Sequence, residues 1–318
     1  MRFCKLTGAQ NKHYSNQSGL MSILVEHLTK IYGSQKALND VSFEAEHGKV
    51  TGFLGPNGAG KSTTMKIATG YISATSGRVI VDGVDVSSDA LKVKKSTGYL
   101  PEHNPLYLDM YVKEYLGFVA DAYGVKNKKG KVEEMIDLCG LQVEKSKKIR
   151  ALSKGYRQRV GLAQSLIHDP SVLILDEPTS GLDPNQLVEI REVIKNVSQE
   201  KTVILSSHIM QEVEALCDSV VIINKGEIVA NDQVANLRSA SSDLYEYEVE
   251  FESEIDIKVF KGNEIDISVV KDSVYSFKAK EDPRKVIMKL AGEKELPLIN
   301  ISKKEQSLEG VFRELTQS

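Results

Sequence analysis

The sequence predicts an α/β fold built on a largely parallel sheet that helices cover. Polar residues stand at the carboxyl ends of several predicted strands, where open α/β sheets place their ligands. The chain has 318 residues, of which 41% are hydrophobic, so it can form one or two domains with a core. Aliphatic segments alternate with helical ones, as in covered parallel sheets, and the strands are expected around residues 51–54, 78–81, 172–175, 203–206 and 220–223.

A glycine-rich segment directly follows the predicted strand at 50–54. Residues 55–63 read GPNGAGKST, and the glycines allow backbone N–H groups to line a concavity for phosphate oxygens at the start of a helix. We expect Lys61 to reach the terminal phosphates of a nucleoside triphosphate and Ser62 to offer its hydroxyl to Mg²⁺. A chance match is the alternative, which the flanking strand and helix disfavour. The residues expected to bind the nucleotide here are Gly55, Pro56, Asn57, Gly58, Ala59, Gly60, Lys61, Ser62 and Thr63.

Two acids end the apolar strand at 172–175. We expect Asp176 to hold Mg²⁺, directly or through water, because it lies at the carboxyl end of its strand. Glu177 is then placed beside the terminal phosphate, where a carboxylate orients or deprotonates the attacking water. Two solvated acids are a common alternative. The tight turn PTSGLD at 178–183 and a further strand with a polar end at 202–208 favour the functional interpretation.

A third motif, LSKGYRQR at residues 152–159, stands between the phosphate-binding loop and the two acids. With it, residues 22–236 resemble in order the nucleotide-binding subunit of an ATP-binding cassette (ABC) transporter. The resemblance implies an ABC cassette of the P-loop NTPase class, with a RecA-like core sheet and a helical subdomain. It also implies ATP and Mg²⁺ as cofactors.

The same resemblance assigns roles to further residues. It implies that Tyr32 stacks on adenine and that Ser153 and Gly155, in the signature segment 152–156, contact phosphate. Asp183 ends the loop that crosses between subunits, and His208 contacts the γ-phosphate as a catalytic residue beside Glu177. Alone, Tyr32 could be a half-buried residue at a strand end, and a lone histidine is usually structural.

Two positions depart from the family pattern. The signature is commonly LSGGQ, and here Lys154 and Tyr156 replace a glycine and the glutamine, whereas Ser153 and Gly155 remain. Glu102 stands where the family commonly has a glutamine. A carboxylate can still ligate Mg²⁺ or a water, but it adds negative charge beside a polyphosphate. Glu102 is therefore a candidate contact of both the metal and the nucleotide.

Longer segments narrow the resemblance. Residues 98–111, 152–163 and 176–191 are similar to the ATP-binding subunit of the gliding-motility ABC transporter of Bacteroidetes, within the group of multidrug, polysaccharide and natriuretic exporters. This implies an ATPase that powers a separately encoded transmembrane permease. It would lie in the cytoplasm, peripheral on the inner face of the cell membrane. In this family the phosphate-binding loop and the signature of one subunit do not meet on one ATP, so the resemblance also implies a head-to-tail homodimer.

Other protein classes also use a phosphate-binding loop. A soluble, non-transport ABC ATPase usually carries paired cassettes, coiled-coil insertions or zinc cysteines, which this single-cassette sequence lacks. An unrelated kinase or GTPase would lack the signature segment. The net charge of −3 gives no basic field, so we expect no nucleic-acid partner. The three cysteines are far apart, which indicates reduced thiols and no disulfide framework.

The expected domains follow from changes in pattern along the chain. Residues 1–21 are polar without the apolar core of a signal peptide, so they are expected to be disordered or to precede the true start. The ATPase domain is expected at 22–238, with its helical subdomain at about 103–168, where the aliphatic strand signal disappears. Residues 243–318 are expected to form a small α+β accessory domain, without a catalytic group and with its last helix from Ser307.

Periodicity predicts several side-chain positions. Val132, Met135, Ile136 and Cys139 fall on one helical face. Tyr107, Tyr111 and Tyr115 are four residues apart and form either core or a docking stripe, with core packing favoured. Alternation at 245–252 predicts a strand with one face in water.

Overall fold

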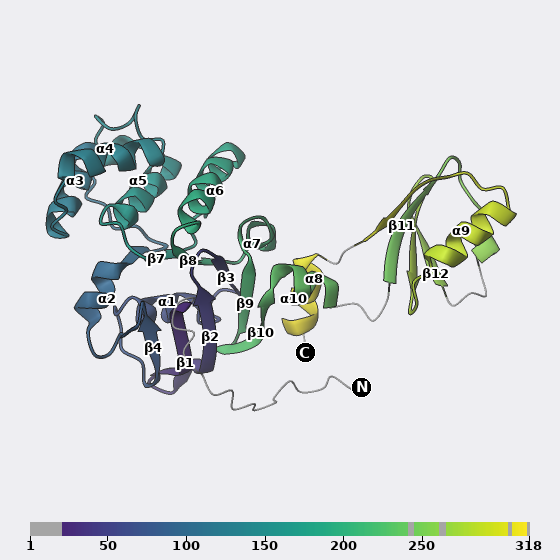
Figure 1. Ribbon diagram of the computed structural model, residues 1–318, viewed down its shortest axis with the longest axis horizontal. Coiled ribbons are helices and arrows are strands. Elements are labelled where there is room, and N and C mark those ends of the chain that lie inside the picture. The colour runs from purple at the N-terminus through teal and green to yellow at the C-terminus, as the bar shows by residue number, and fades with distance from the viewer. Residues whose placement is uncertain (1–20, 241–244, 261–264, 305–306, 317–318) are drawn as a thin grey trace. The chain divides into compact units, whose positions relative to one another are not determined.

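The computed structural model describes residues 21–240, 245–260, 265–304 and 307–316 (Figure 1). The chain divides into two compact units, one of residues 1–208 and 223–228 and the other of residues 209–222 and 229–318. Of residues 1–21, which were expected to be disordered or to precede the true start, residues 1–20 lie outside the described residues. The division falls after His208, so the domain boundaries expected at 22–238 and 243–318 stay a prediction.

Parallel strands form the centre of the first unit. β3 (Val50–Leu54), β8 (Thr202–Ser207), β7 (Val172–Asp176) and β6 (Thr97–Leu100) are adjacent in that order and parallel. With β9 (Ser219–Asn224) and β10 (Glu227–Gln233) the sheet has six strands, in the order β10-β9-β3-β8-β7-β6. Every residue of β3, β7 and β8 is buried, as expected for parallel strands that are covered on both faces. The α/β fold class is confirmed.

The strand expected at 78–81 belongs to a second sheet. β4 (Ser76–Val81) lies in an antiparallel sheet of order β2-β1-β4-β5, with β1 (Met21–Tyr32), β2 (Gln35–Glu46) and β5 (Val84–Asp85). Phe43 of β2 packs on Phe53 of β3 with ring centroids 5.1 Å apart, which joins the two sheets. Two helices complete this part of the fold, α1 (Lys61–Ala68) and α2 (Ala90–Ser96).

The chain forms three helices between β6 and β7 in the sequence, and these helices pack together (Figure 1). They are α3 (Val112–Ala122), α4 (Lys128–Leu138) and α5 (Lys154–Leu166), and a short 3₁₀ turn at Ile149–Ala151 precedes α5. The four side chains predicted to share one face of α4 and its C-cap are all buried: Val132, Met135, Ile136 and Cys139. Tyr115 is buried, whereas Tyr107 and Tyr111 are 55% and 47% exposed, so core packing holds for only one of the three tyrosines. After β7 comes α6 (Pro184–Ser198).

The second unit contains a small antiparallel sheet of order β12-β13-β11-β14. Its strands are β11 (Tyr245–Phe251), β12 (Ile265–Lys271), β13 (Val274–Ala279) and β14 (Leu298–Lys303), with a 3₁₀ turn at Ile257–Phe260. The alternation predicted for β11 is confirmed, because Tyr247, Val249 and Phe251 enter one core with Ile287 of α9 (Arg284–Glu293).

The last helix packs outside that core. α10 (Leu308–Thr316) lies against α7 (Met210–Leu216) and α8 (Val234–Ala240). Leu308 and Val311 are buried, and the backbone N–H of Leu308 donates to Glu214 of α7. The small sheet therefore lies in the chain between two helices that pack together, although the sequence pattern grouped α10 with it.

In the part of the chain that the structure describes, no helix is long and apolar enough to cross a bilayer.

Gly98 brings β6 against the end of α5, and this contact generates a stability prediction. A Cβ at Gly98 would overlap the carbonyl oxygen of Ser165 and lie 3.0 Å from side-chain atoms of Leu173 and Pro170. We expect Gly98→Ala to lower the free energy of unfolding by about 2 kcal/mol, because the backbone must shift. Gly117→Ala in α3 is the matched control, since its Cβ would meet only the flexible end of Lys128. Urea unfolding should separate the two variants, and equal stabilities would contradict the overlap at Gly98.

Candidate nucleotide-binding site

The phosphate-binding loop lies between β3 and α1. Gly58 and Gly60 have positive φ angles of 80° and 115°. A Cβ on Gly60 would lie 2.6 Å from Leu38 and 2.9 Å from the carbonyl oxygen of Ala37, so only glycine fits. No side chain caps α1, and its first turn has no acid. Its N-terminal N–H groups therefore suit an anion.

Lys61 extends from α1 into this loop. Its ammonium donates to the carbonyl oxygens of Gly55 at 2.7 Å and Pro56 at 3.3 Å. It also lies 3.8 Å from Oε1 of Glu177, and the side chain is buried. Burial lowers the pKa of Lys61, while the charges of Glu177 and Asp176 oppose this shift. The lysine is thus held at the bottom of the loop by weak carbonyl acceptors that a phosphate can replace.

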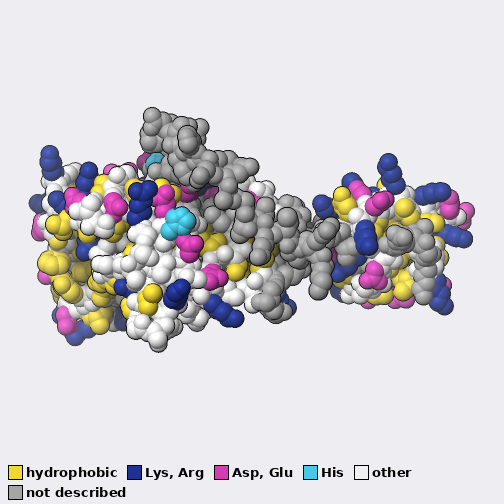
Figure 2. All heavy atoms as spheres, turned by 90° about the horizontal axis from the view of Figure 1, so that it is seen from below, with side chains coloured by type: hydrophobic (Ala, Val, Ile, Leu, Met, Phe, Trp, Pro, Cys, Tyr) yellow, Lys and Arg dark blue, Asp and Glu magenta, His cyan; other side chains and the backbone are white. Residues whose placement is uncertain are grey.

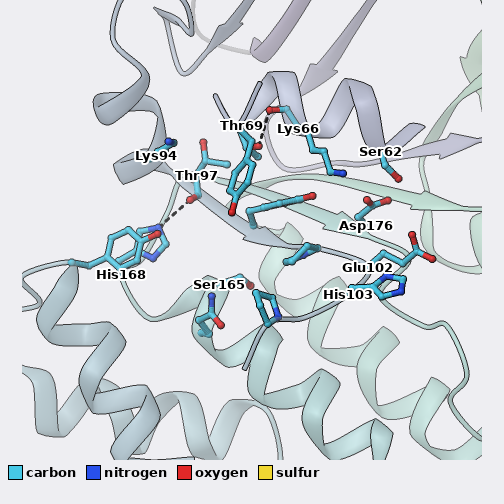
Figure 3. Close-up of a pocket in the computed structure, with 16 residues that line it drawn as sticks. Ser62, Lys66, Thr69, Lys94, Thr97, Glu102, His103, Ser165, His168 and Asp176 are labelled. Atoms are coloured by element: carbon cyan, nitrogen blue, oxygen red, sulfur yellow. Dashed lines mark hydrogen bonds between the residues drawn. The ribbon is translucent and has the colours of Figure 1, made fainter. Parts of the chain in front are cut away.

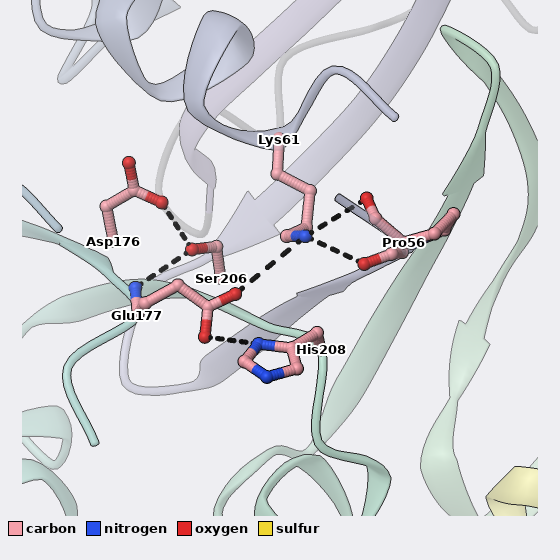
Figure 4. Close-up of polar contacts among 7 residues, drawn as sticks. Pro56, Lys61, Asp176, Glu177, Ser206 and His208 are labelled. Carbon is pink, nitrogen blue, oxygen red and sulfur yellow. Dashed lines mark hydrogen bonds and ion pairs between the residues drawn. The ribbon is translucent and has the colours of Figure 1, made fainter. Parts of the chain in front are cut away.

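Ser206 of β8 connects the two acids at the end of β7 (Figure 4). Its hydroxyl donates to Oδ1 of Asp176 at 2.6 Å and accepts the backbone N–H of Glu177 at 3.0 Å. Glu177 has a φ of 52°, so the chain turns sharply after Asp176. Because of this turn, the carboxylate of Asp176 contacts Ser206, whereas the carboxylate of Glu177 faces Lys61 and His208.

The Glu177 carboxylate lies between the imidazole of His208 and the ammonium of Lys61 (Figure 4). Nδ1 of His208 is 2.9 Å from Oε2 of Glu177, a distance at which Nδ1–H donates to the carboxylate. Lys61 faces the other oxygen. Burial raises the pKa of Glu177, and the hydrogen bond and charge of His208, with the charge of Lys61, oppose that shift. A buried carboxylate of raised pKa is a stronger base than an exposed one.

A cavity of about 610 Å³ collects most of the residues predicted from the sequence. It is lined by Tyr32, Asn57, Gly58, Gly60, Lys61, Ser62, Thr63, Glu102, Glu177 and His208. Its volume is in the range of small-ligand sites. Tyr32 is 48% exposed at this cavity, and the Lys30 ammonium lies over one face of its ring, 4.9 Å from the centroid.

Sequence reasoning missed three residues of this cavity and one beneath it. Gln35 and Ala37 of β2 and Ser180 also line it. Ser206 supports it from below. Ser206 belongs to the polar end of an apolar strand, which the sequence did indicate, but its bond to Asp176 depends on the pairing of β7 with β8. Gln35 and Ala37 carry no local signal.

A second cavity, of about 490 Å³, adjoins the first and shares Ser62 and Glu102 with it (Figure 3). Asp176 lines it as well, so three oxygen-bearing side chains from α1, β7 and the segment after β6 border one space. Hard cations such as Mg²⁺ take oxygen ligands of this kind and keep several waters. Within the described residues, no three His, Cys, Asp or Glu side chains form a metal cage. Ser62, Asp176 and Glu102 therefore suit an ion that also uses phosphate oxygens and water.

Ser153, Gly155 and Asp183 do not line either cavity. The Ser153 hydroxyl accepts the N–H of Tyr156 at 3.4 Å and caps α5. Oδ1 of Asp183 accepts the N–H groups of Asn185 and Gln186, at 3.1 Å and 3.0 Å, and caps α6. These residues have structural roles within the chain and stand apart from the nucleotide cavity.

Comparison with known proteins agrees with this geometry. Residues 38–180 match the family model described as ABC transporter. The chain is 35% identical to the uncharacterized ABC transporter ATP-binding protein YhcH of Bacillus subtilis (strain 168), over 92% of this chain and 95% of that protein. It is 32% identical to the bacitracin transport ATP-binding protein BcrA of Bacillus licheniformis, over 91% and 95%.

A solved structure described as the ATP binding subunit of an ABC transporter has a TM-score of 0.64 and 28% identity, and the match covers 69% of this chain and 92% of that one. The sequence relatives span nearly the whole chain, so the likeness is not limited to the residues around the cavity. The chain therefore belongs to the ATP-binding subunits of ABC transporters, which are ATPases with this cassette fold.

Proposed function

We propose that this ATPase powers an export-type ABC transporter by forming a head-to-tail homodimer on a separately encoded transmembrane permease. One observation is the main support for the proposed dimer. The cavity that holds Lys61 and Glu177 lacks the signature residues Ser153 and Gly155 of the same chain. A second copy, turned by a twofold rotation, can supply them to the open side of the cavity and receive the same contribution in return.

The nucleotide would bind along the length of the cavity. The ring of Tyr32 stacks on adenine at one end, and the loop from Gly55 to Thr63 holds the phosphates at the other. Lys61 leaves the carbonyl groups of Gly55 and Pro56 and donates to the terminal phosphates, because charged acceptors form stronger hydrogen bonds than carbonyls. Its departure also removes the cation that now faces Oε1 of Glu177.

Glu177 would then act on the attacking water. With Lys61 on the phosphates, Oε1 of Glu177 is free to orient or deprotonate a water, while His208 holds Oε2. The same histidine is half-exposed in the cavity and reaches toward the terminal phosphate. The positive-φ turn at Glu177 keeps this carboxylate on the cavity side of β7.

Mg²⁺ would be held by Ser62 and Asp176, with Glu102 as a further direct or water-mediated contact. When bound, the ion supplies charge neutralisation for the transferred phosphate oxygens. Asp176 keeps one carboxylate oxygen for this role, because Ser206 occupies only Oδ1. Glu102 adds a negative charge that the family's usual glutamine lacks, so its contact with phosphate would run through the ion or a water.

ATP would shift the population of the protein toward the closed dimer. Only the dimer completes the site around the triphosphate, so ATP binds it better than it binds the separate subunits. Hydrolysis removes that preference, and the dimer opens. This cycle would move the transmembrane helices of the permease.

We place the permease contact at the exposed aromatic pair Tyr107 and Phe118, which are 55% and 47% exposed. Their ring centroids lie 5.5 Å apart. Clustered exposed aromatic side chains mark interaction surfaces. The protein would then lie in the cytoplasm against the inner face of the cell membrane.

The cellular role of the transporter has two candidates. The motifs at 98–111, 152–163 and 176–191 favour the gliding-motility exporter of Bacteroidetes. The likeness to BcrA, which is named for bacitracin transport, favours export of a peptide antibiotic.

A soluble, non-transport ABC ATPase is the alternative function. Nucleic acid as its partner is disfavoured by the net charge of −3, and Figure 2 shows side chains of both charge signs interspersed on the face in view.

The permease should be recoverable with the protein. We expect a tagged copy to co-purify, from detergent-solubilised membranes of the source organism, with a protein of several hydrophobic spans. Deletion of the gene should abolish surface gliding if the transporter serves gliding motility, and should raise bacitracin sensitivity if it exports a peptide antibiotic. Recovery only in the soluble fraction, with neither phenotype, would favour the non-transport ATPase.

Replacing the proposed base tests the hydrolytic mechanism. We expect Glu177→Gln to keep ATP binding, to lower the ATPase rate by about 10²–10⁴-fold and to accumulate an ATP-bound dimer, since it removes the carboxylate that acts on water. Phosphate release and size-exclusion chromatography measure the two effects. Glu192→Gln, an exposed acid of α6, is the control. A near wild-type rate for Glu177→Gln would exclude the proposed role.

Blocking the signature tests the shared site. Ser153→Arg should leave ATP binding by the monomer intact and prevent ATP-dependent dimerisation, because a bulky cation would fill the contact between subunits. Loss of the Ser153 cap on α5 costs about 1 kcal/mol, and Ser153→Ala separates this effect from the added bulk. Val143→Arg, at a position that is 81% exposed, controls for the new charge. Normal dimerisation of Ser153→Arg would contradict the head-to-tail arrangement.

A further inference from the structure

The signature segment and the turn at 178–183 pack against each other within one chain. Gly181 has a φ of 70°, and a Cβ there would overlap the ammonium of Lys154 and lie 3.1 Å and 3.3 Å from its Cε and Cδ. A Cβ on the neighbouring Gly155 would overlap the side chain of Gln186, in the first turn of α6. Two successive residues of the signature segment, Lys154 and Gly155, therefore lie against Gly181 and the side chain of Gln186.

The Lys154 ammonium is a positive charge without a counter-ion. Its side chain is exposed, and it forms no hydrogen bond or ion pair with any other described residue. Other cations nearby already have partners, since Arg159 pairs with Glu189 and Arg157 donates to the carbonyl oxygen of Arg150. The first turn of α5 contains no acid that could neutralise the lysine. Lys154 therefore leaves a net positive charge at the surface of the signature segment.

The contact with Gly181 restricts where this charge can lie. A free lysine side chain samples many rotamers, and holding it in one costs conformational entropy. Packing of the Lys154 stem on the bare Gly181 backbone offsets part of that cost before any partner arrives. The charge is thus partly positioned in the single subunit.

We propose that Lys154 is a positioning residue for ATP-driven dimerisation, presenting a held positive charge to the triphosphate bound on the second copy. This inference rests on the head-to-tail dimer proposed above. Ser153 and Gly155 flank Lys154, so a triphosphate that meets them comes close to its ammonium. The family's usual glycine at this position brings no charge. In this chain, closure therefore gains an electrostatic contribution that depends on the number of phosphates.

The experiment measures ATP-dependent dimerisation in the Glu177→Gln protein at several NaCl concentrations by analytical ultracentrifugation. Lys154→Met keeps the length of the side chain and removes its charge, and Lys154→Arg keeps the charge. At low salt we expect Lys154→Met to weaken the dimer by about threefold, the scale of one exposed charge pair. Salt screens such charges, so the gap from the parent should shrink as NaCl rises. Lys154→Arg should stay near the parent, and Lys92→Met, at an exposed lysine of α2, should not change the affinity.

The outcomes separate this inference from the proposed function. If the Glu177→Gln parent does not dimerise with ATP, the head-to-tail dimer and the role of Lys154 both fail. If the parent dimerises and Lys154→Met matches its affinity and salt dependence, only the role of Lys154 fails. A loss that is the same at all salt concentrations and is not rescued by Lys154→Arg would overturn the electrostatic role in favour of packing on Gly181.

Discussion

The chemistry of the site depends on the register between β7 and β8. Asp176 pairs with Ser206 in the parallel ladder, and this pairing lets one buried hydroxyl serve both acids. The Glu177 N–H reaches the Ser206 hydroxyl at 3.0 Å and its carbonyl oxygen at 3.2 Å. These bonds hold a non-glycine residue at positive φ, a conformation that costs about 1 kcal/mol or more. A slip of one residue would exchange the faces of β8 and take the Ser206 hydroxyl away from both acids.

The site residues that could be predicted from the sequence are those that belong to short continuous motifs. The phosphate-binding loop is a local structure, so its glycines, Lys61 and Ser62 identify it without knowledge of the rest of the fold. Asp176 and Glu177 follow from their position at a strand end. Gln35, Ala37 and the bridging role of Ser206 depend on strand pairing and on contacts between sheets, which composition does not encode. The roles of Ser153, Gly155 and Asp183 depend on a second copy and stay predictions.

Prediction of the fold was limited in the same way: the elements could be predicted, but their neighbours in space could not. Buried aliphatic strands were predicted well, because parallel strands that are covered on both faces are apolar throughout. The strand at 78–81 is also largely aliphatic, yet its neighbours are β1 and β5 of the other sheet, and the local sequence does not identify a neighbour. The sequence predicted a last helix from Ser307, and the structure has α10 there, with Leu308 and Val311 buried. The sequence did not identify the surface that the helix covers, since α7 and α8 are remote in sequence.

The placement of α10 has a consequence for biosynthesis. A ribosome releases α7 and α8 first, then the whole four-stranded sheet, and only afterwards α10. Until then, the apolar surface that receives Leu308 and Val311 has no cover, and the Glu214 carboxylate lacks the N–H of Leu308. Domains generally fold as they emerge, so the small sheet can form while this corner of the molecule is still open. If translation stalls after the sheet, the chain would expose the apolar surface of α7 and α8 that α10 normally covers. Chaperones and proteases recognise surfaces of this kind.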